Sequence, residues 1–299
     1  MSKVSVIIPA RNENLIARVV KDVYDKASGE IEVIVIFDGE PYYFLPDCPN
    51  LCTIHLPQAI GMRECMNIAA SKATGEYLFK IDAHCSLGLG FDEILKRDCD
   101  TDWIVVPRIY AANYDDDDLF DIPRLNRSID YYYLSCPWTH PRFFQMMSCF
   151  WDTKTQAVND KPIDEIMTFQ GSCWFMHTDY WRNFLHGVEP SKTFGPYAEH
   201  QEMGFKIWLG GGKAMVNKNA WYAHQQRSNK RRGWHRAISE FHSSHIQVAH
   251  YFVENKWPGK IHDFDWLIEK FWPLPTETTR GYGEEYFWPM DWRKFCEQN

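Results

Sequence analysis

The sequence lacks the features that would place it in or across a membrane. None of its apolar runs approaches the ~20 residues that a spanning helix needs. Its opening, MSKVSVIIPARNE, is a charged, strand-like segment rather than a signal peptide. Internal repeats and low-complexity segments are absent as well. These absences predict a cytoplasmic protein with no membrane partner.

Cysteine is present but has no pattern. Nine cysteines are scattered over 299 residues, and none are paired at the two-residue spacing of a structural zinc site. In a cytoplasmic protein they are expected to be reduced and to act as small buried hydrophobes. The hydrophobic fraction of 45% and charged fraction of 24% exclude wholesale disorder, collagen-like chains and coiled coils. The formal charge of −8 argues against a general nucleic-acid binder.

Three short apolar runs near the N-terminus predict strands buried on both faces, at residues 4–9, 32–37 and 76–81. Segments 14–26 and 60–73 between them have the apolar spacing of helices. Strands that alternate with helices, with polar residues after each strand, are typical of a doubly wound α/β sheet. In such sheets ligands bind at the carboxyl ends of the strands.

Beyond residue 100 the alternation is looser. Strands are predicted at 103–107, 169–176 and 213–216, and helices at 202–209 and 238–255. Aromatic residues make up 16% of the chain and are dense in segment 129–164 and in the tail 257–299. Because aromatic rings form contact surfaces as readily as cores, we expect the first segment to wrap the core or shape a pocket. We expect the tail to pack back across the domain.

The triplet Asp82-Ala83-His84 follows the third predicted strand. Two side chains one residue apart on an extended segment point the same way, so the carboxylate and the imidazole are placed to share a divalent cation. A mixed oxygen and nitrogen set suits Mn²⁺ better than Ca²⁺. On spacing alone the alternative competes well: an aspartate that caps a turn, beside a polar loop histidine.

Four motifs, in one order, resemble those of the polypeptide N-acetylgalactosaminyltransferases and their family 2 glycosyltransferase relatives. They are VSVIIPARNE with the later VIVIFD, the segment from Arg63 through Gly75-Glu76 to KIDAHC, the acidic AEHQEMGFKIW followed by GGG, and the late WYAH. The resemblance implies a glycosyltransferase-A fold, an α/β architecture with a Rossmann-like mixed sheet flanked by helices. The catalytic domain would be residues 1–236, with a nucleotide-binding half (1–100) and an acceptor and donor-sugar half (101–236). Residues 237–299 would be a C-terminal helical and aromatic appendage.

Carried over residue by residue, the resemblance implies a site for a UDP-sugar donor. The uridine pocket would be lined by Pro9, Arg11, Glu13 and Asp38, with Arg63 close to the nucleotide. The metal, Mn²⁺ or Mg²⁺, would be held by Asp82, His84 and His224. The neighbours Trp221 and Tyr222 alone would favour a histidine of an aromatic cluster at position 224, whereas the resemblance favours a metal ligand.

The acidic motif departs from the pattern of inverting relatives, which carry an aspartate as base directly after the residue matched by Glu199. Here that position is His200, and the retaining relatives also lack the aspartate. With an ordinary pKa of about 6.5, His200 suits a base oriented by Glu199, or a hydrogen-bond donor to sugar or acceptor. Glu202 either faces along its own helix or approaches the sugar. Retention and inversion both stay open.

Two further segments are candidates for donor binding. Gly171 belongs to a small-residue turn that in the family contacts the donor sugar and β-phosphate, and Trp174 offers a flat ring to floor the sugar pocket. Residues 213–236 hold seven basic side chains and no acidic ones, Arg227 among them. This stretch is a loop that closes over the diphosphate, a footprint for a polyanionic acceptor such as DNA, or a solvated basic loop.

The sequence therefore predicts a metal-dependent enzyme that moves a hexose or N-acetylhexosamine from a UDP-sugar to an acceptor hydroxyl. The acceptor is a protein or glycan, or a hydroxymethylated base in DNA. Without the stem and lectin domain of the secretory relatives, a stand-alone enzyme of bacterial or viral type is favoured. The alternative is a non-catalytic nucleotide-sugar-binding module, which His200 keeps open. A nucleotidyltransferase ranks last, because its glycine-rich phosphate loop is missing from residues 10–13.

Overall fold

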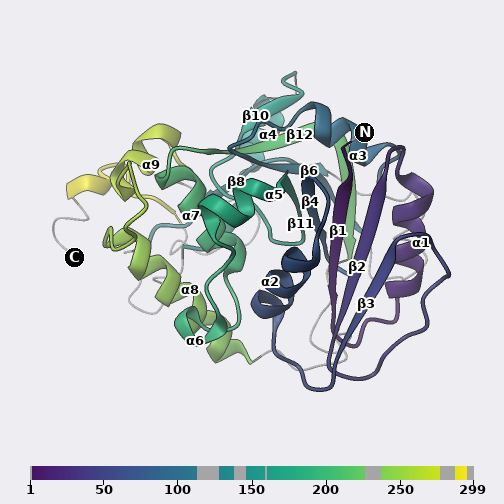
Figure 1. Ribbon diagram of the computed structural model, residues 1–299. Helices are drawn as coiled ribbons and strands as arrows, with labels where there is room; N and C mark the ends of the chain where they lie inside the picture. Colours follow the sequence, from purple (N-terminus) through teal and green to yellow (C-terminus); the bar gives the residue numbers. More distant parts are fainter. Residues whose placement is uncertain are drawn as a thin grey trace.

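The first part of the chain folds into parallel strands with helices beside them (Figure 1). The computed structural model describes residues 2–112, 128–137, 146–158, 160–225, 237–276 and 287–294. The parallel strands are β1 (Val4–Ala10), β2 (Ile31–Asp38), β3 (Leu51–Leu56) and β4 (Tyr77–Ile81). Their helices are α1 (Ile16–Lys26), α2 (Met62–Lys72) and α3 (Phe91–Arg97). Every residue of β1 is buried because this strand lies inside the sheet, which explains its unbroken apolar run.

The sheet continues with strands from the second half of the chain, and most of the added pairings are antiparallel. In the described residues it has ten strands, in the order β10-β12-β6-β11-β4-β1-β2-β3, with β5 on β12 and β7 on β6. The added strands are β5 (Cys85–Leu87), β6 (Trp103–Ala112), β7 (Ser128–Ile129), β10 (Ile163–Glu165), β11 (Cys173–His177) and β12 (Lys213–Gln225). Strand β11 is antiparallel to both β4 and β6, and β12 is parallel to β6, so β1, β2, β4, β6 and β12 all end at the same edge.

The aromatic segment 129–164 contains regular structure of its own. Strands β8 (Tyr132–Leu134) and β9 (Ser148–Phe150) form a separate two-stranded sheet, followed by α4 (Asp152–Ala157). The tail packs onto this segment. Trp288 is buried, and its indole N–H donates to the carbonyl oxygen of Leu134 at 2.6 Å.

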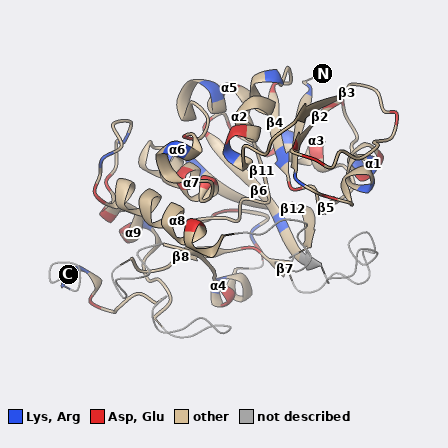
Figure 2. Cartoon of the chain, turned by 90° about the horizontal axis from the view of Figure 1, so that it is seen from below, with Lys and Arg blue, Asp and Glu red and all other residues tan. Residues whose placement is uncertain are grey.

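A group of helices lies on the opposite side of the central strands from α1 and β3 (Figure 2). They are α5 (Thr178–Tyr180), which runs on as a π-helical turn (Trp181–Leu185), α6 (Ser191–Phe194), α7 (Glu199–Leu209), α8 (Ile238–Val253) and α9 (Phe264–Phe271). Helix α8 contacts α6 and α7, and α9 contacts α7. The division into a domain over 1–236 and an appendage over 237–299 stays a prediction.

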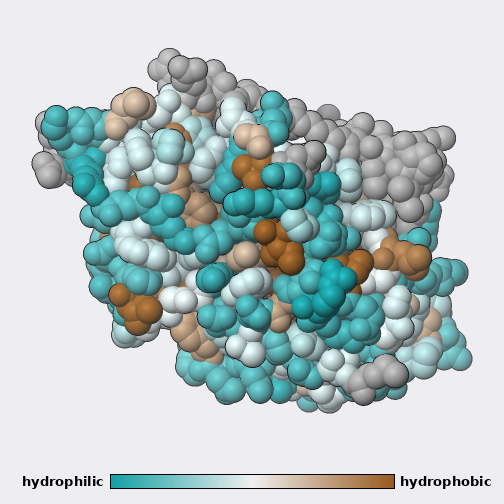
Figure 3. Space-filling view, turned by 90° about the horizontal axis from the view of Figure 1, so that it is seen from above, coloured by the Kyte–Doolittle hydropathy of each residue, from teal (hydrophilic) through white to brown (hydrophobic). Residues whose placement is uncertain are grey.

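The surface shown in Figure 3 is mostly hydrophilic, with small, separate hydrophobic patches. Among the described helices, none is both long and apolar enough to cross a bilayer. Six of the eight described cysteines are buried, as expected for small hydrophobes, whereas Cys52 is exposed on the edge strand β3.

Candidate active site

Strand ends bring together residues that lie far apart in the sequence. Asp82 follows β4, and its N–H donates to the carbonyl oxygen of Ser172 at 2.8 Å. Strand β5 then pairs antiparallel with the end of β12, so that Cys85 lies opposite His224. This register places His224 beside His84, although 140 positions separate them along the chain.

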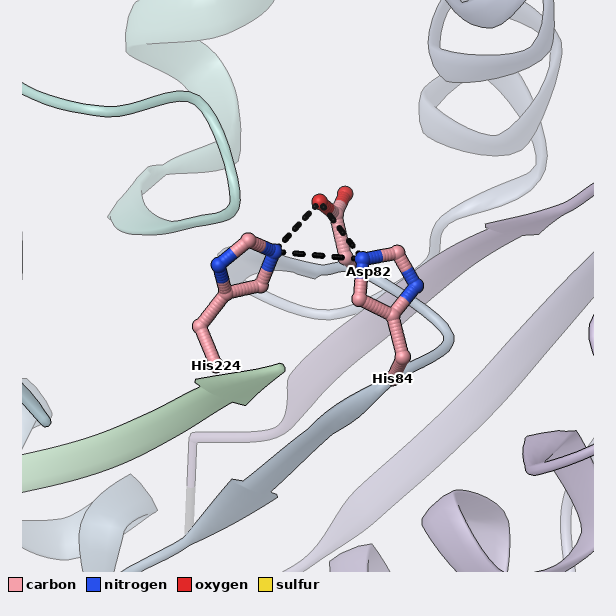
Figure 4. A group of neighbouring side chains, drawn as sticks. All are labelled: Asp82, His84 and His224. Atoms are coloured by element: carbon pink, nitrogen blue, oxygen red, sulfur yellow. Dashed lines mark hydrogen bonds and ion pairs between the residues drawn. The ribbon is translucent and has the colours of Figure 1, made fainter. Parts of the chain in front are cut away.

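Asp82, His84 and His224 point toward a common centre (Figure 4). The Nε2 atoms of the two histidines are 3.1 Å apart. Asp82 Oδ2 lies 3.5 Å from the Nε2 of His224 and 3.9 Å from that of His84. Each of the three residues offers one ligand atom, and these atoms lie close enough together to bind one metal ion. A carboxylate oxygen with two imidazole nitrogens suits Mn²⁺ and similar borderline cations.

The protonation of the histidines fits a metal as well. The two Nε2 atoms face each other, so at most one proton lies between them, and a cation would use the lone pairs of both. Burial is the main reason that the pKa of His224 is below its ordinary value, which keeps the ring neutral, as a ligand must be. Its Nδ1 is buried and has no hydrogen-bond partner among the described residues.

Glu13, expected only in the uridine pocket, also touches the metal group. Its Oε1 lies 3.2 Å from Nδ1 of His84, on the far side of the ring from Nε2. A carboxylate behind a ligating histidine fixes its tautomer and raises its basicity. Glu13 therefore directs the Nε2 lone pair of His84 toward the common centre while still lining the pocket.

Lys80 holds the other oxygen of Asp82. This lysine is 1% exposed, forms an ion pair with Asp82 Oδ1, and donates to the carbonyl oxygen of Gly171 at 2.6 Å. Burial alone would raise the pKa of Asp82, but Lys80 and the two histidines outweigh it and hold that pKa well below its ordinary range. Burial alone would lower the pKa of Lys80, but Asp82 and Glu199 raise it, so both groups are charged.

The metal group lines a pocket of about 260 Å³ at this edge of the sheet. Three of the residues expected to bind uridine line the same pocket: Pro9, Arg11 and Asp38. The carboxylate of Asp38 accepts from the backbone N–H groups of Ile60, at 2.6 Å, and Gly61, at 3.1 Å. These bonds fix the carboxylate at the carboxyl end of β2.

Gly171, Glu199 and His200 also line this pocket. A Cβ on Gly171 would come within 2.9 Å of Glu199 Oε1, so a larger residue there would displace the carboxylate. Burial alone would raise the pKa of Glu199. His200, whose Nδ1 is 3.9 Å from Glu199 Oε1, together with Arg63 and Lys80, lowers that pKa to about 2. Glu199 therefore keeps its negative charge beside the imidazole of His200.

Arg63 and Glu202 do not line the pocket. Both are completely buried and form an ion pair with each other, away from the pocket surface. Arg63 also donates to the carbonyl oxygens of Tyr197 and Glu189. For Glu202 this arrangement agrees with the structural alternative, and Arg63 helps to position the loop whose Tyr197 lines the pocket.

Trp174, expected to form the floor of the sugar pocket, does not line the pocket. Its side chain is fully buried and stacks on Trp181 with ring centroids 5.2 Å apart. A ring without an exposed face cannot floor a sugar pocket, so that expectation is wrong. Arg227, and most of the basic stretch around it, lies outside the described residues.

Sequence reasoning missed Lys80 and Tyr197, which both line the pocket. Only Lys80 carried a signal that could have been read. It stands two residues before Asp82 at the end of an otherwise apolar strand, and the period of two puts both side chains on one face. Tyr197 lies in the connection between α6 and α7, which is held by Arg63, a residue distant in sequence.

A mixed α/β sheet with a candidate metal group and a pocket at its strand ends is the arrangement of a glycosyltransferase-A enzyme. The model of the family "Glycosyl transferase family 2" matches residues 5–177, more than half of the chain. The protein therefore belongs to glycosyltransferase family 2, as its motifs predicted.

Among solved structures, the fold is similar to that of GalNAc-T7, crystallised with UDP, GalNAc and Mn²⁺, at a TM-score of 0.65 and 17% identity. The match covers 91% of this chain and 56% of the other, so the protein spans little more than half of its neighbour's length. Staphylococcus aureus TarS (residues 1–349, with UDP-GlcNAc) matches at a TM-score of 0.49 and 14% identity, over 76% of this chain and 59% of that one. No curated protein matches the sequence.

Proposed function

We propose that the protein transfers a hexose or N-acetylhexosamine from a UDP-sugar to an acceptor hydroxyl, with a divalent cation, Mn²⁺ or Mg²⁺, at Asp82, His84 and His224. The observation that carries the proposal is the convergence of three metal-ligand atoms in the same pocket as Asp38 and Arg11. When bound, the cation would neutralise the diphosphate leaving group. The GalNAc-T7 structure, which holds UDP and Mn²⁺ in the same fold, supports this donor and metal class.

The protein's own residues divide the remaining work in this proposal. Asp38 and Pro9 receive the uridine, and Arg11 lies beside the nucleotide. Across the pocket, Glu199 keeps its charge and orients His200. The imidazole then acts on the acceptor hydroxyl, either as its base or as a hydrogen-bond donor.

The first test is turnover of a panel of UDP-sugars with Mn²⁺, measured for the wild type, Asp82→Asn and Asp25→Asn. The control carboxylate Asp25 is exposed on α1, where it pairs with Lys21. We expect slow hydrolysis of one donor, lowered about 10³-fold by Asp82→Asn, because the loss of one ligand removes several kcal/mol of charge stabilisation. Asp25→Asn should match the wild type.

Tight UDP binding without turnover of any donor would instead identify a non-catalytic binding module. Equal turnover by Asp82→Asn and the wild type would contradict the metal assignment.

The acceptor is tested in the same assay by adding a polypeptide, a glycan or hydroxymethylated duplex DNA. The DNA hypothesis rests on the basic stretch 213–236, of which the structure describes only the part up to residue 225. Stimulation by modified DNA that falls steeply with added salt would support DNA as the acceptor. Stimulation by a polypeptide or glycan, insensitive to salt, would reject it.

A further inference from the structure

The buried ammonium group of Lys80 contacts Asp82, one of the three candidate metal ligands, and so affects how strongly a cation can bind. A lysine buried to 1% exposure is stable only with close partners, and Lys80 has two, Asp82 Oδ1 and the carbonyl oxygen of Gly171. Gly171 lines the same pocket as the three candidate ligands. The ammonium group therefore occupies a fixed position directly behind the aspartate that would bind the cation.

This position matters because the three candidate ligands carry only one negative charge among them. Asp82 is the only anion among the three ligands, since His84 and His224 bind metals as neutral rings. Lys80 cancels that single negative charge at hydrogen-bond distance. Two further carboxylates line the pocket beside Asp38: Glu13, which contacts the far nitrogen of His84 rather than the common centre, and Glu199, which lies beside His200.

A diphosphate reverses this balance. It would bring at least two negative charges into the pocket, where they attract both the cation and the ammonium group of Lys80. We propose that Lys80 couples the two ligands, so that the free pocket holds a divalent cation weakly and the nucleoside diphosphate raises its affinity. The inference rests on the proposed function, because it takes UDP and a divalent cation as the ligands of this pocket.

Coupling of this kind is reciprocal: the cation must raise the affinity for UDP by the same factor. Once either the cation or the nucleotide has left after a turnover, the other would be held weakly and would follow. Lys80 acts through Asp82 and is a positioning residue rather than a catalytic one.

Two substitutions separate the charge of Lys80 from its hydrogen bonds. Lys80→Gln keeps a donor for Asp82 and Gly171 but removes the charge, and Lys80→Met removes both. The matched control is Lys206→Met on α7. Lys206 is also buried and paired with a carboxylate, Oε1 of Glu202 at 2.7 Å, but it is not part of the pocket lining.

The measurement is the free Mn²⁺ signal in electron paramagnetic resonance, titrated without UDP and with saturating UDP. For the wild type we expect UDP to tighten Mn²⁺ binding about 100-fold, near the upper end of ordinary coupling factors. Both Lys80 variants should bind Mn²⁺ alone at least about tenfold more tightly, with the effect of UDP reduced to below about tenfold. Lys206→Met should keep the wild-type factor.

The outcomes distinguish this inference from the proposed function. If the wild type binds neither Mn²⁺ nor UDP, the proposed function fails. If it binds both but Lys80→Gln keeps the wild-type coupling, the charge of Lys80 has no such role and the inference is overturned. Weaker Mn²⁺ binding by Lys80→Gln would also overturn it, since Lys80 would then serve only to orient Asp82. Circular dichroism checks that each variant is folded, and Lys80→Gln decides if Lys80→Met is not.

Discussion

Asp82 and Glu202 each pair with a buried lysine, and their surroundings differ in one respect. Both oxygens of Glu202 are occupied, Oε2 by Arg63 and Oε1 by Lys206 and the N–H of Glu189, and its side chain is 0% exposed. Asp82 uses only Oδ1 for its lysine, and its side chain is 18% exposed. Its Oδ2 faces two histidine nitrogens in a pocket. Glu202, with both oxygens paired, holds a loop in place. Asp82 has an oxygen that faces the pocket and is therefore able to bind a metal ion.

The largest effect is expected from Glu202→Gln, which tests whether Glu202 has a purely structural role. The substitution leaves Arg63 and Lys206 buried without their shared counter-charge, so the free energy of unfolding should fall by about 3–5 kcal/mol. Urea denaturation followed by tryptophan fluorescence measures the change. A loss below about 1 kcal/mol would show that the backbone carbonyls alone satisfy Arg63 and Lys206. In the folded fraction Mn²⁺ binding should persist, because no ligand has changed.

A smaller effect is expected from Glu13→Gln, which alters the pocket and leaves the buried cluster intact. The glutamine oxygen still accepts from Nδ1 of His84 but lacks the negative charge that raises the basicity of the ring. Mn²⁺ affinity should fall about 10-fold to 100-fold, the usual effect of removing a carboxylate behind a ligating histidine. Paramagnetic resonance titration gives the affinity, and an unchanged value would mean that Glu13 serves the nucleotide alone. The free energy of unfolding should change little.

The smallest effect concerns His245 of α8, which is buried 6.0 Å from His200 between ring centroids but stays neutral. Burial, followed by the charge of His200, lowers the pKa of His245 to about 3. Below pH 6.5 His245 binds a proton in the unfolded chain but not in the native state. The free energy of unfolding therefore falls as the pH is lowered. The loss should reach about 2 kcal/mol between pH 6.5 and about pH 5. His245→Gln should remove this part of the pH dependence; parallel profiles for the two proteins would contradict it.

The sequence predicted the elements whose signal is local. Strands β1, β2 and β4 were visible as apolar runs because both of their faces are covered. Strand β3 was missed because it lies at the edge of the sheet, where exposed polar residues such as Thr53 and His55 interrupt the apolar run. Only four residues of β12 were predicted, since polar Asn217 to Asn219 lie where its register shifts.

For the site, the motifs predicted the metal group and the pocket-lining Asp38, Glu199 and His200. They could not predict the direction of Arg63 or Trp174, because each turns toward a partner that is distant in sequence. Arg63 meets Glu202, 139 positions later, and Trp174 meets Trp181 on the π-helical turn. Such choices are made by tertiary packing, which local sequence does not encode.

The pairing of β5 with the end of β12 has a consequence for the order of synthesis. A growing chain carries Asp82 and His84 long before His224 exists, and until β12 has joined the sheet those two residues make an incomplete site. A cation bound by all three would link the turn between β4 and β5 to β12, the last strand of the described sheet to be made. The chain would then bind the metal with full affinity only after β12 has joined the sheet, and the bound ion would stabilise the completed sheet.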